Sequence, residues 1–465
     1  MTIQQKMFQE LHERTVFDKA RQYAYAYADE MSERHVYPTD EALVSLSQFD
    51  EELPALPLEG TEVIEQLHKY GSPATVAQTG GRYFGFVNGG VVPTGLAAKW
   101  LADFWDQNTA MQVISPISSK LEVVVERWLR ELFQLPDRTA AGFVSGSFAA
   151  TFCGLAAARY RLLERLEWDV NRQGLSAAPI IRIVTSRQAH STVLKAIGLL
   201  GFGQDNIEWV DVDDQGRIIT DRMPQFDART IVILQAGNVN SGCYEDFESI
   251  CQLAVKAGAW VHIDGAFGLW VGAVETLRHL TKGIELANSW AVDGHKTLNT
   301  PYDCGIVLCE DREALVAALH MSGAYIVLGT DRDGMFYTPE MSRRARIIEL
   351  WAVMKSLGRQ GMDEMILGLH HRAVQFAQEL TAAGFTILNE VVFNQVLVYY
   401  HTDEITMKVL DTVQRMSVCW CGGSVWEGKR VIRISVCSWA TTVEDVRRSV
   451  ASFVLARNRH YSGGL

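Results

Sequence analysis

From about Gly142 to Glu310 the sequence alternates short apolar runs with segments of helical periodicity. The apolar runs are hydrophobic on both faces, as strands buried between two layers of helices must be. They are IIRIVTS (180–186), TIVILQAG (230–237), AWVHIDGAF (259–267), SWAVDGH (289–295) and CGIVLCE (304–310). This alternation predicts an α/β fold with a largely parallel sheet, in which ligands bind beyond the carboxyl ends of the strands.

The segments on either side of this region predict an arm before it and a smaller unit after it. Residues 1–75 show helical apolar spacing and connectors, so we expect an N-terminal helical arm that packs on the main body or on a partner subunit. The large α/β domain is then expected over residues 76–320. A long helix (RRARIIELWAVMKSLG) and a strand that leads into a helix (VIRISVCSW, then TTVEDVRRSVASFVLARN) predict a small α+β domain over residues 321–465.

Composition indicates a folded globular protein and disfavours a polyanionic partner. Hydrophobic residues make up 48% of the 465 residues, and the net charge is −12. An excess of negative charge opposes nucleic-acid binding. The sequence shows no signal-peptide core and no run of about 18 apolar residues, and its eight cysteines lack paired CxxC spacing. We expect a cytoplasmic protein without a metal, a membrane anchor or a nucleic-acid partner.

Lys296 and Asp264 each follow a predicted buried strand, where the ligand cleft of such a sheet opens. A partly desolvated lysine has the lowered pKa that imine formation requires, although most lysines are solvated surface residues. A buried carboxylate needs a cationic partner, and a pyridinium nitrogen is one. A helix cap or a salt bridge is the alternative for Asp264. Together the two residues indicate an enzyme that carries pyridoxal-5′-phosphate (PLP) as a Schiff base on Lys296.

A phosphate site and a ring contact are predicted at two helix starts. In VSGSFAATF a Gly/Ser turn leads into a helix from about Phe148, and free N–H groups there suit the cofactor phosphate. Gly146 and Ser147 are the candidates, although such turns also begin helices without a ligand. His190 follows another strand, where its ring could stack on a planar cofactor. A capping or core histidine is the alternative.

The ordered set of SGS, RQAHSTVLKA, AWVHIDGAFG and SWAVDGHKTLNTPYDCG resembles the PLP-dependent group II amino-acid decarboxylases. That family includes aromatic-L-amino-acid and glutamate decarboxylases and has the PLP-dependent transferase fold of type I. The resemblance covers most of residues 80–450. It implies that Lys296 is the Schiff-base lysine, that Asp264 binds the pyridine nitrogen and that His190 stacks on the ring.

The same resemblance implies further cofactor contacts and a partner. Ala266 is expected on the other face of the ring, and His295 and Ser147 at the phosphate. Asn238, directly after TIVILQAG, is also placed among the cofactor-binding residues. The resemblance further implies a homodimer whose partner contributes to each active site.

The implied reaction is decarboxylation of an L-amino acid to the amine and CO₂. The segment RYFGFVNGG supplies the expected substrate pocket of Tyr83, Phe84, Phe86 and Asn88. These aromatic groups favour an aromatic substrate, because desolvating a distal carboxylate there would be costly. The alternatives are a glutamate- or aspartate-type decarboxylase, a decarboxylation-dependent oxidative deaminase and a catalytically inactive PLP-binding dimer.

The chain departs from the resembled family at three places. Phe148 occupies the phosphate turn, and Asp293 stands where relatives often carry Asn. The third place is the loop before Arg343, where the resemblance implies a tyrosine that protonates the carbanion left by CO₂. We expect Tyr325 in this role, with Tyr337 as the second choice. Absence of such a tyrosine would predict an aldehyde product.

Overall fold

The computed structural model describes residues 1–320 and 332–460. The helices are α1 (Ile3–Glu13), α2 (Thr15–Glu30), α3 (Asp40–Ser45), α4 (Gly60–Gln66), α5 (Pro93–Trp105), α6 (Pro116–Phe133), α7 (Ser147–Glu164), α8 (Val170–Gln173), α9 (Ser191–Leu199), α10 (Phe247–Ala257), α11 (Arg312–Leu319), α12 (Ile347–Ala382), α13 (Asp403–Met416) and α14 (Val443–His460). The strands are β1 (Ala140–Val144), β2 (Arg182–Ser186), β3 (Ile207–Val210), β4 (Thr230–Gln235), β5 (Trp260–Asp264), β6 (Ser289–Asp293), β7 (Gly305–Cys309), β8 (Thr386–Ile387), β9 (Gln395–Tyr399), β10 (Gly422–Trp426) and β11 (Lys429–Ser435).

All five predicted runs become strands of one seven-stranded sheet, with the order β1-β7-β6-β5-β4-β2-β3. Strands β3, β2, β4, β5 and β6 are parallel, whereas β7 is antiparallel to both β6 and β1. The predicted α/β class with a largely parallel sheet is therefore confirmed. The parallel arrangement brings the carboxyl ends of β4, β5 and β6 to one edge of the sheet.

Helices cover both faces of this sheet, which explains why its strands are apolar throughout. In β4, Ile231 and Ile233 pack with α7, α9 and α11, while Val232 and Leu234 pack with α6, α10 and α12 on the opposite face. Successive strand residues point to opposite faces, so both sets must be hydrophobic. The two cores hold the strand ends, and therefore the loops that follow them, in fixed relative positions.

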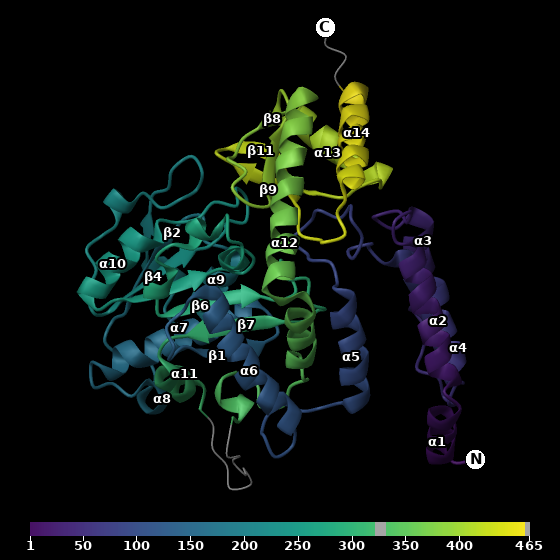
Figure 1. Ribbon diagram of the computed structural model, residues 1–465, viewed down its shortest axis with the longest axis horizontal. Coiled ribbons are helices and arrows are strands. Elements are labelled where there is room, and N and C mark those ends of the chain that lie inside the picture. The colour runs from purple at the N-terminus through teal and green to yellow at the C-terminus, as the bar shows by residue number, and fades with distance from the viewer. Residues whose placement is uncertain (321–331, 461–465) are drawn as a thin grey trace.

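A second, antiparallel sheet with the order β10-β11-β9-β8 lies above the large sheet in Figure 1. The long helix α12 runs between the two sheets (Figure 1), and it is interrupted at Gly358, whose φ of 61° is non-helical. Helices α13 and α14 pack with the small sheet in a separate core. The small α+β unit expected from the C-terminal sequence is thus present.

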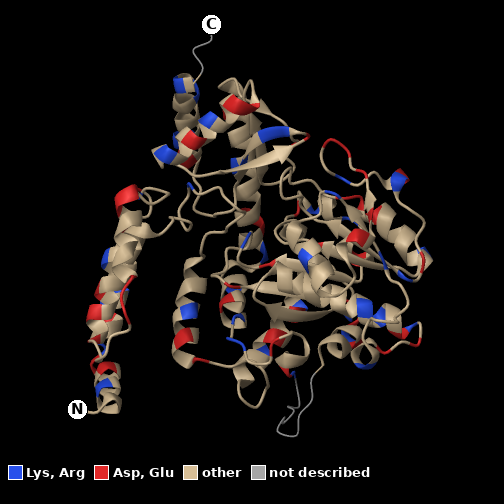
Figure 2. Ribbon diagram, turned by 180° about the vertical axis from the view of Figure 1, so that it is seen from behind, with Lys and Arg blue, Asp and Glu red and all other residues tan. Residues whose placement is uncertain are grey.

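The N-terminal helices α1 to α4 form an arm that projects from the body (Figure 1). The arm touches α5 through aromatic pairs, with ring centroids 5.1 Å apart for Phe17 and Phe104 and 5.8 Å for Tyr25 and Trp100. Figure 2 shows Lys and Arg interspersed with Asp and Glu along the described elements. Among the described helices, none has the length and apolar character needed to cross a membrane.

Candidate active site

The candidate site lies where β4, β5 and β6 end. Asp264 closes β5, and it is in register with Gln235 on β4 and with Ala291 on β6. Lys296 follows the end of β6 by three residues. The sheet therefore brings these two predicted residues to neighbouring strand ends, as the sequence pattern requires.

Asp264 is buried, with 7% of its surface exposed, and it is left without a cation at close range. Its Oδ1 accepts a hydrogen bond from the Ala266 N–H at 3.2 Å. In the described part of the chain, no Lys, Arg or His nitrogen lies within 4.0 Å of this carboxylate. Burial raises the pKa of Asp264, while the charges of His190 and Lys296 act in the opposite direction. A cationic ligand would remove the cost of burying this charge.

His190 caps α9 and also faces the site. Its Nδ1 lies 2.7 Å from the Thr192 hydroxyl and accepts the Thr192 N–H at 3.3 Å. Burial lowers the pKa of His190, so the imidazole is neutral at pH 7 despite the nearby Asp264. The capping alternative is therefore present, and the cap fixes the His190 ring where the charges of Asp264 and Lys296 act on it.

Lys296 is held by a carboxylate that also caps helix α7. Its Nζ lies 3.1 Å from Asp293 Oδ2, and Asp293 Oδ1 accepts the Ser147 N–H at 2.5 Å. His295 Nε2 lies 3.7 Å from Asp293 Oδ2, and His295 Nδ1 accepts the Cys304 N–H at 3.0 Å. Burial lowers the pKa of His295. The predicted phosphate residues and the predicted Schiff-base lysine are thus one connected group.

Two glycines allow this group to pack closely. Gly146 precedes α7 in extended backbone, and a Cβ placed on it would lie 3.5 Å from Cε1 of His295. On the neighbouring β7, a Cβ on Gly305 would overlap the backbone of Gly146. Gly305 therefore supports the turn, although the sequence analysis did not select it. Sequence spacing alone could not show that β7 lies against this turn.

Asn238 and Ala266 complete the predicted cofactor-binding set. Asn238 is 1% exposed, and its Oδ1 accepts the N–H groups of Asn240 and Ser241 at 2.9 and 3.3 Å. Its Nδ2 has no hydrogen-bond acceptor among the described residues. The Ala266 carbonyl accepts the Asp293 N–H at 2.8 Å, which joins the end of β5 to the end of β6.

The predicted substrate segment passes directly over Lys296. A side chain at Gly89 would overlap the Lys296 carbonyl. Asn88 Nδ2 donates to Gln78 Oε1 at 2.7 Å, and Asn88 Oδ1 accepts the hydroxyl of Tyr302 at 3.1 Å. The ring of Tyr302 stacks on His295, with centroids 4.2 Å apart. Asn88 is therefore linked to the cofactor residues through Tyr302, which the sequence analysis missed.

The aromatic residues of RYFGFVNGG separate into two environments. Tyr83 and Phe86 both stack on Trp420, with centroids 5.2 and 5.6 Å apart, and Phe86 is 65% exposed. Phe84 is only 1% exposed and packs edge-on against Phe376 in the core of the small sheet. The prediction that Phe84 lines the substrate pocket is therefore wrong, because this side chain points into the opposite layer.

Arg433 on β11 is a third residue that the sequence analysis missed. Its Nη1 donates to the Val239 carbonyl at 3.0 Å, and its charge acts on His190. Burial lowers the pKa of Arg433, and no carboxylate in the described residues lies within 4.0 Å of it. The only available signal was its alternation within VIRISVCSW, which does not reveal proximity to β4. A partly buried guanidinium without an anion can receive a carboxylate ligand.

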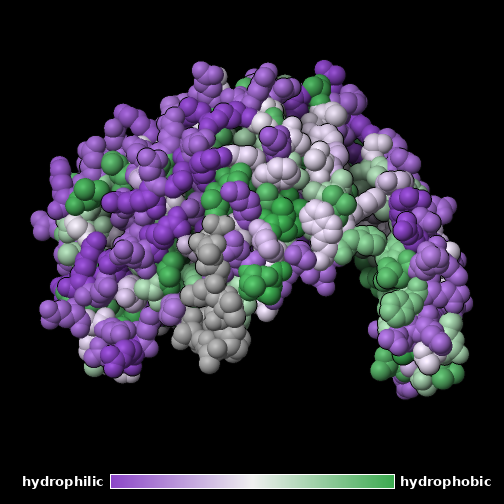
Figure 3. All heavy atoms as spheres, turned by 60° about the horizontal axis from the view of Figure 1, so that its bottom comes forward, coloured by the Kyte–Doolittle hydropathy of each residue, from purple (hydrophilic) through white to green (hydrophobic). Residues whose placement is uncertain are grey.

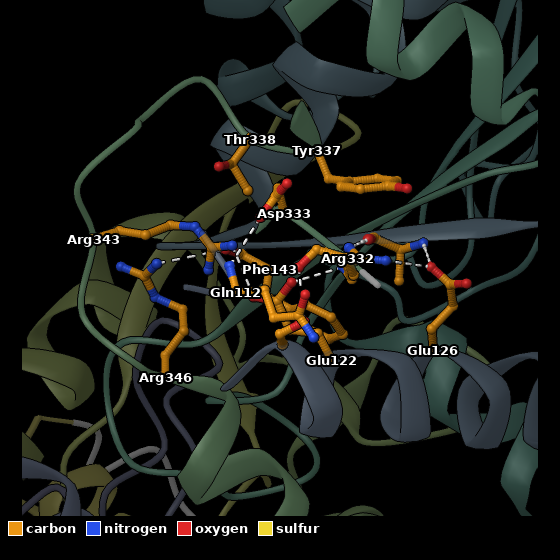
Figure 4. A network of polar contacts seen from close by, with 12 residues as sticks. Gln112, Glu122, Glu126, Phe143, Arg332, Asp333, Tyr337, Thr338, Arg343 and Arg346 are labelled. Atoms are coloured by element: carbon orange, nitrogen blue, oxygen red, sulfur yellow. Dashed lines mark hydrogen bonds and ion pairs between the residues drawn. The ribbon is translucent and has the colours of Figure 1, made fainter. Parts of the chain in front are cut away.

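Of the two tyrosines considered as proton donors, Tyr325 lies outside the described residues. Tyr337 is engaged elsewhere: its hydroxyl accepts from Arg312 Nη1 at 2.8 Å, and its ring lies 3.7 Å from the guanidinium carbon of Arg332. Figure 4 shows the ring of Tyr337 beside Arg332. Tyr337 therefore serves as a packing residue of that network in this chain.

The residues at the strand ends fit PLP. The cofactor would find an amine at Lys296, an unpaired buried carboxylate at Asp264 for its ring nitrogen, and a neutral imidazole at His190. The start of α7 offers N–H groups for a phosphate. Among the described residues, no cluster of three or more His, Cys, Asp or Glu side chains is arranged to hold a metal ion.

Comparison with known proteins gives a consistent picture. The sequence matches the pyridoxal-dependent decarboxylase conserved domain over residues 43–401. It is 25% identical over 337 residues to human cysteine sulfinic acid decarboxylase, covering 69% of this chain and 67% of that protein. It is 26% identical over 375 residues to L-2,4-diaminobutyrate decarboxylase of Rhizobium meliloti, covering 74% and 70%. Alignments with four curated relatives span 60% to 70% of their lengths.

Among solved structures, Oryza sativa TDC with PLP and tryptamine superimposes with a TM-score of 0.88 at 19% sequence identity. The superposition covers 96% of this chain and 97% of that one. At this identity the likeness concerns the fold.

Proposed function

The chain belongs to the pyridoxal-dependent decarboxylase family, and from this premise we propose that it decarboxylates an L-amino acid with an aromatic side chain to the corresponding amine. Family membership confirms three predictions made from the motifs: the family itself, the type I fold and PLP as the cofactor. The observation that carries the proposed decarboxylation is that Lys296, Asp264 and His190 lie at or after the ends of β6, β5 and β2, at the same carboxyl edge of the parallel sheet.

When bound, PLP supplies an electron sink for the electron pair released as CO₂ leaves the substrate. Lys296 would hold the cofactor through its amine. The Lys296 Nζ lies 3.1 Å from Asp293 Oδ2. Asp264 would keep a proton on the pyridine nitrogen, since burial makes an unpaired carboxylate there costly. His190, neutral and fixed by Thr192, would present its ring without adding a charge.

Arg433 would receive the carboxylate of the incoming amino acid. It donates to the carbonyl of Val239 in the loop after β4, and its charge acts on His190 in the site. A guanidinium fork orients a carboxylate through two parallel hydrogen bonds. Such orientation matters because the bond that breaks must align with the π system of the cofactor.

Aromatic surfaces at the rim support the proposed substrate class. Phe86 and Tyr83 flank Trp420, and Tyr302 covers His295. These rings offer an apolar wall to a planar side chain, while Asn88 and Gln78 are already hydrogen-bonded to each other.

The test is a panel of L-amino acids incubated with PLP-loaded protein, with CO₂ and amine measured separately. The panel contains phenylalanine, tyrosine, tryptophan, glutamate, aspartate, cysteine sulfinate and 2,4-diaminobutyrate, and Lys296→Ala serves as the blank. We expect the highest kcat/KM for an aromatic member. Preference for an acidic or basic member would contradict the aromatic class, and aldehyde with oxygen consumption would identify an oxidative decarboxylase.

We also propose that the functional unit is a homodimer. The arm and α5 expose large apolar side chains: Phe8 is 65% exposed, Leu11 55%, Leu101 54% and Phe104 66%. Figure 3 shows apolar atoms on the side of the arm that faces the body, across a hollow. Apolar surface of this kind marks an interaction site, and a second copy could cover it. Sedimentation equilibrium should give twice the chain mass of 51.9 kDa.

A further inference from the structure

Asp293 places a buried negative charge at the start of helix α7, within the cofactor site. The residue is 1% exposed, and its carboxylate accepts the Ser147 N–H at 2.5 Å. The N-cap residue Gly146 has no side chain to cap the helix, so Asp293 does this from 146 positions away in the sequence. The same carboxylate lies 3.1 Å from Lys296 Nζ and 3.7 Å from His295 Nε2.

These partners are the groups that a phosphate at this site would use. Free N–H groups at a helix start bind phosphate because they point at the ligand and the helix dipole favours negative charge. The Ser147 N–H is one such donor, and Asp293 already occupies it. His295 adjoins the same turn, 3.5 Å from the Cβ position of Gly146. A carboxylate and a phosphate therefore contend for one set of donors.

The surrounding charges do not offset this competition. Asp264 adds a second buried carboxylate, which acts on His190, Lys296 and Asp293. Burial lowers the pKa of both His190 and His295, so neither imidazole adds a positive charge at pH 7. Lys296 is the one ammonium in direct contact with Asp293 within the described residues. A phosphate brings up to two further negative charges beside Asp293, and like charges in a buried site repel strongly.

We propose that Asp293 is a built-in competitor of the cofactor phosphate: it holds the α7 donor and Lys296 while the site is empty and thereby weakens phosphate binding. As a consequence, PLP binds this site less tightly, and exchanges faster, than it would if position 293 carried a neutral side chain. This inference rests on the cofactor site and not on the proposed substrate.

The test uses apoprotein and no amino-acid substrate. Asp293→Asn keeps an oxygen to accept the Ser147 N–H and replaces the charge with an amide donor. We expect the dissociation constants of PLP and of inorganic phosphate, measured by calorimetry, to fall by about tenfold or more in this variant. Pyridoxal lacks the phosphate and competes with Asp293 only for Lys296, so its affinity should change clearly less than that of PLP in this variant.

A matched control is Asp246→Asn, because Asp246 is an exposed aspartate that caps α10 through the Ser249 N–H at 3.1 Å. This change should leave all three affinities unaltered. The thermal midpoint of the apoprotein shows whether Asp293→Asn folds. If it does not, Asp293→Ser removes the same charge and should also lower the dissociation constants of PLP and inorganic phosphate.

Unchanged or weaker phosphate binding in the neutral variants would overturn the competition. Equal tightening of pyridoxal and PLP would also overturn it, since Asp293 would then act through Lys296 alone. Wild-type protein that forms no coloured complex with PLP would instead refute the cofactor site on which the inference rests.

Discussion

Two buried groups of charges lie in this protein, and they differ in how their charges are paired. Around Arg332 the buried charges have partners of opposite sign: Arg332 reaches Glu122 at 2.8 Å and Glu126 at 2.7 Å, and Arg343 reaches Glu122 at 2.7 Å (Figure 4). In the candidate site, Asp264 at the end of β5 and Arg433 within β11 each lack an oppositely charged side chain within 4.0 Å among the described residues. We interpret the paired charges around Arg332 as structural, and the unpaired charges of Asp264 and Arg433 as the ones that would bind a ligand.

The paired group connects segments that are distant in sequence. Glu126 on α6 accepts the Ala141 N–H of β1 at 2.8 Å and meets Arg312 of α11 at 2.5 Å. Burial would raise the pKa of Glu126, but Arg332 and Arg312 lower it overall. Glu126 thereby connects Arg332 to β1 at the edge of the large sheet. Removing one partner would leave a buried charge without its counter-charge.

The largest predicted effect breaks the paired group. Arg332→Met should lower the free energy of unfolding by about 3–5 kcal/mol, since Glu122 and Glu126 would stay buried without their shared cation. Urea unfolding measures the loss, and PLP affinity should change by less than about twofold. The control is Arg359→Met, because Arg359 pairs with Glu131 at the surface, where the loss should stay below about 1 kcal/mol. Unchanged stability with lost PLP binding would refute the comparison.

In contrast to Arg332→Met, Asp264→Asn should reduce turnover and should raise the stability of the apoprotein. Turnover is expected to fall on the order of 100- to 1000-fold, since an amide cannot hold a proton on the ring nitrogen. The apoprotein should become more stable, because an unpaired buried charge is removed. Burial raises the pKa of Asp264, so this group binds more protons in the folded state, and its own contribution to the stability of the apoprotein should fall as pH rises above about 4.

Urea unfolding of the apoprotein at pH 5 and pH 8 measures this effect. The stability difference between Asp264→Asn and wild type should widen with pH. A variant less stable than wild type at pH 8 would show that Asp264 is paired in the folded protein after all.

Arg433→Lys tests whether the unpaired guanidinium of Arg433 binds the substrate carboxylate. Lysine keeps the charge but loses the planar fork, so KM for the amino acid should rise about tenfold while kcat changes less. Steady-state kinetics on the preferred substrate decide it. Arg430→Lys, at an exposed position of the same strand, should leave KM unaltered. An equal effect from both changes would remove Arg433 from the site.

The smallest predicted effects distinguish Phe84 from Phe86 in the segment RYFGFVNGG. Phe84→Leu should cost about 1 kcal/mol of stability because its ring is buried against Phe376, with KM unchanged. Phe86→Leu should leave stability within about 0.5 kcal/mol and alter KM a few-fold, since the ring is exposed beside Trp420. Thermal unfolding and steady-state kinetics of both variants test this pair. A change of KM in Phe84→Leu would support the prediction from sequence that Phe84 lines the substrate pocket.

The sequence by itself determined the sheet, the family and the cofactor. Strands buried on both faces have an apolar pattern that is local, and chemistry in such sheets follows strand ends, so Asp264 and Lys296 could be found from their positions after AWVHI and SWAV. The ordered motifs then predicted PLP, which the family match confirms.

Only the tertiary structure decided which side chains meet across long stretches of chain. Asp293 contacts the start of α7, Arg433 on the small sheet contacts the loop after β4, and Phe84 turns into the small-sheet core. Residues 83–88 have no regular periodicity from which a facing layer could be assigned. Such pairings depend on how separate layers pack, and packing between layers leaves no periodic signal in either partner's own sequence.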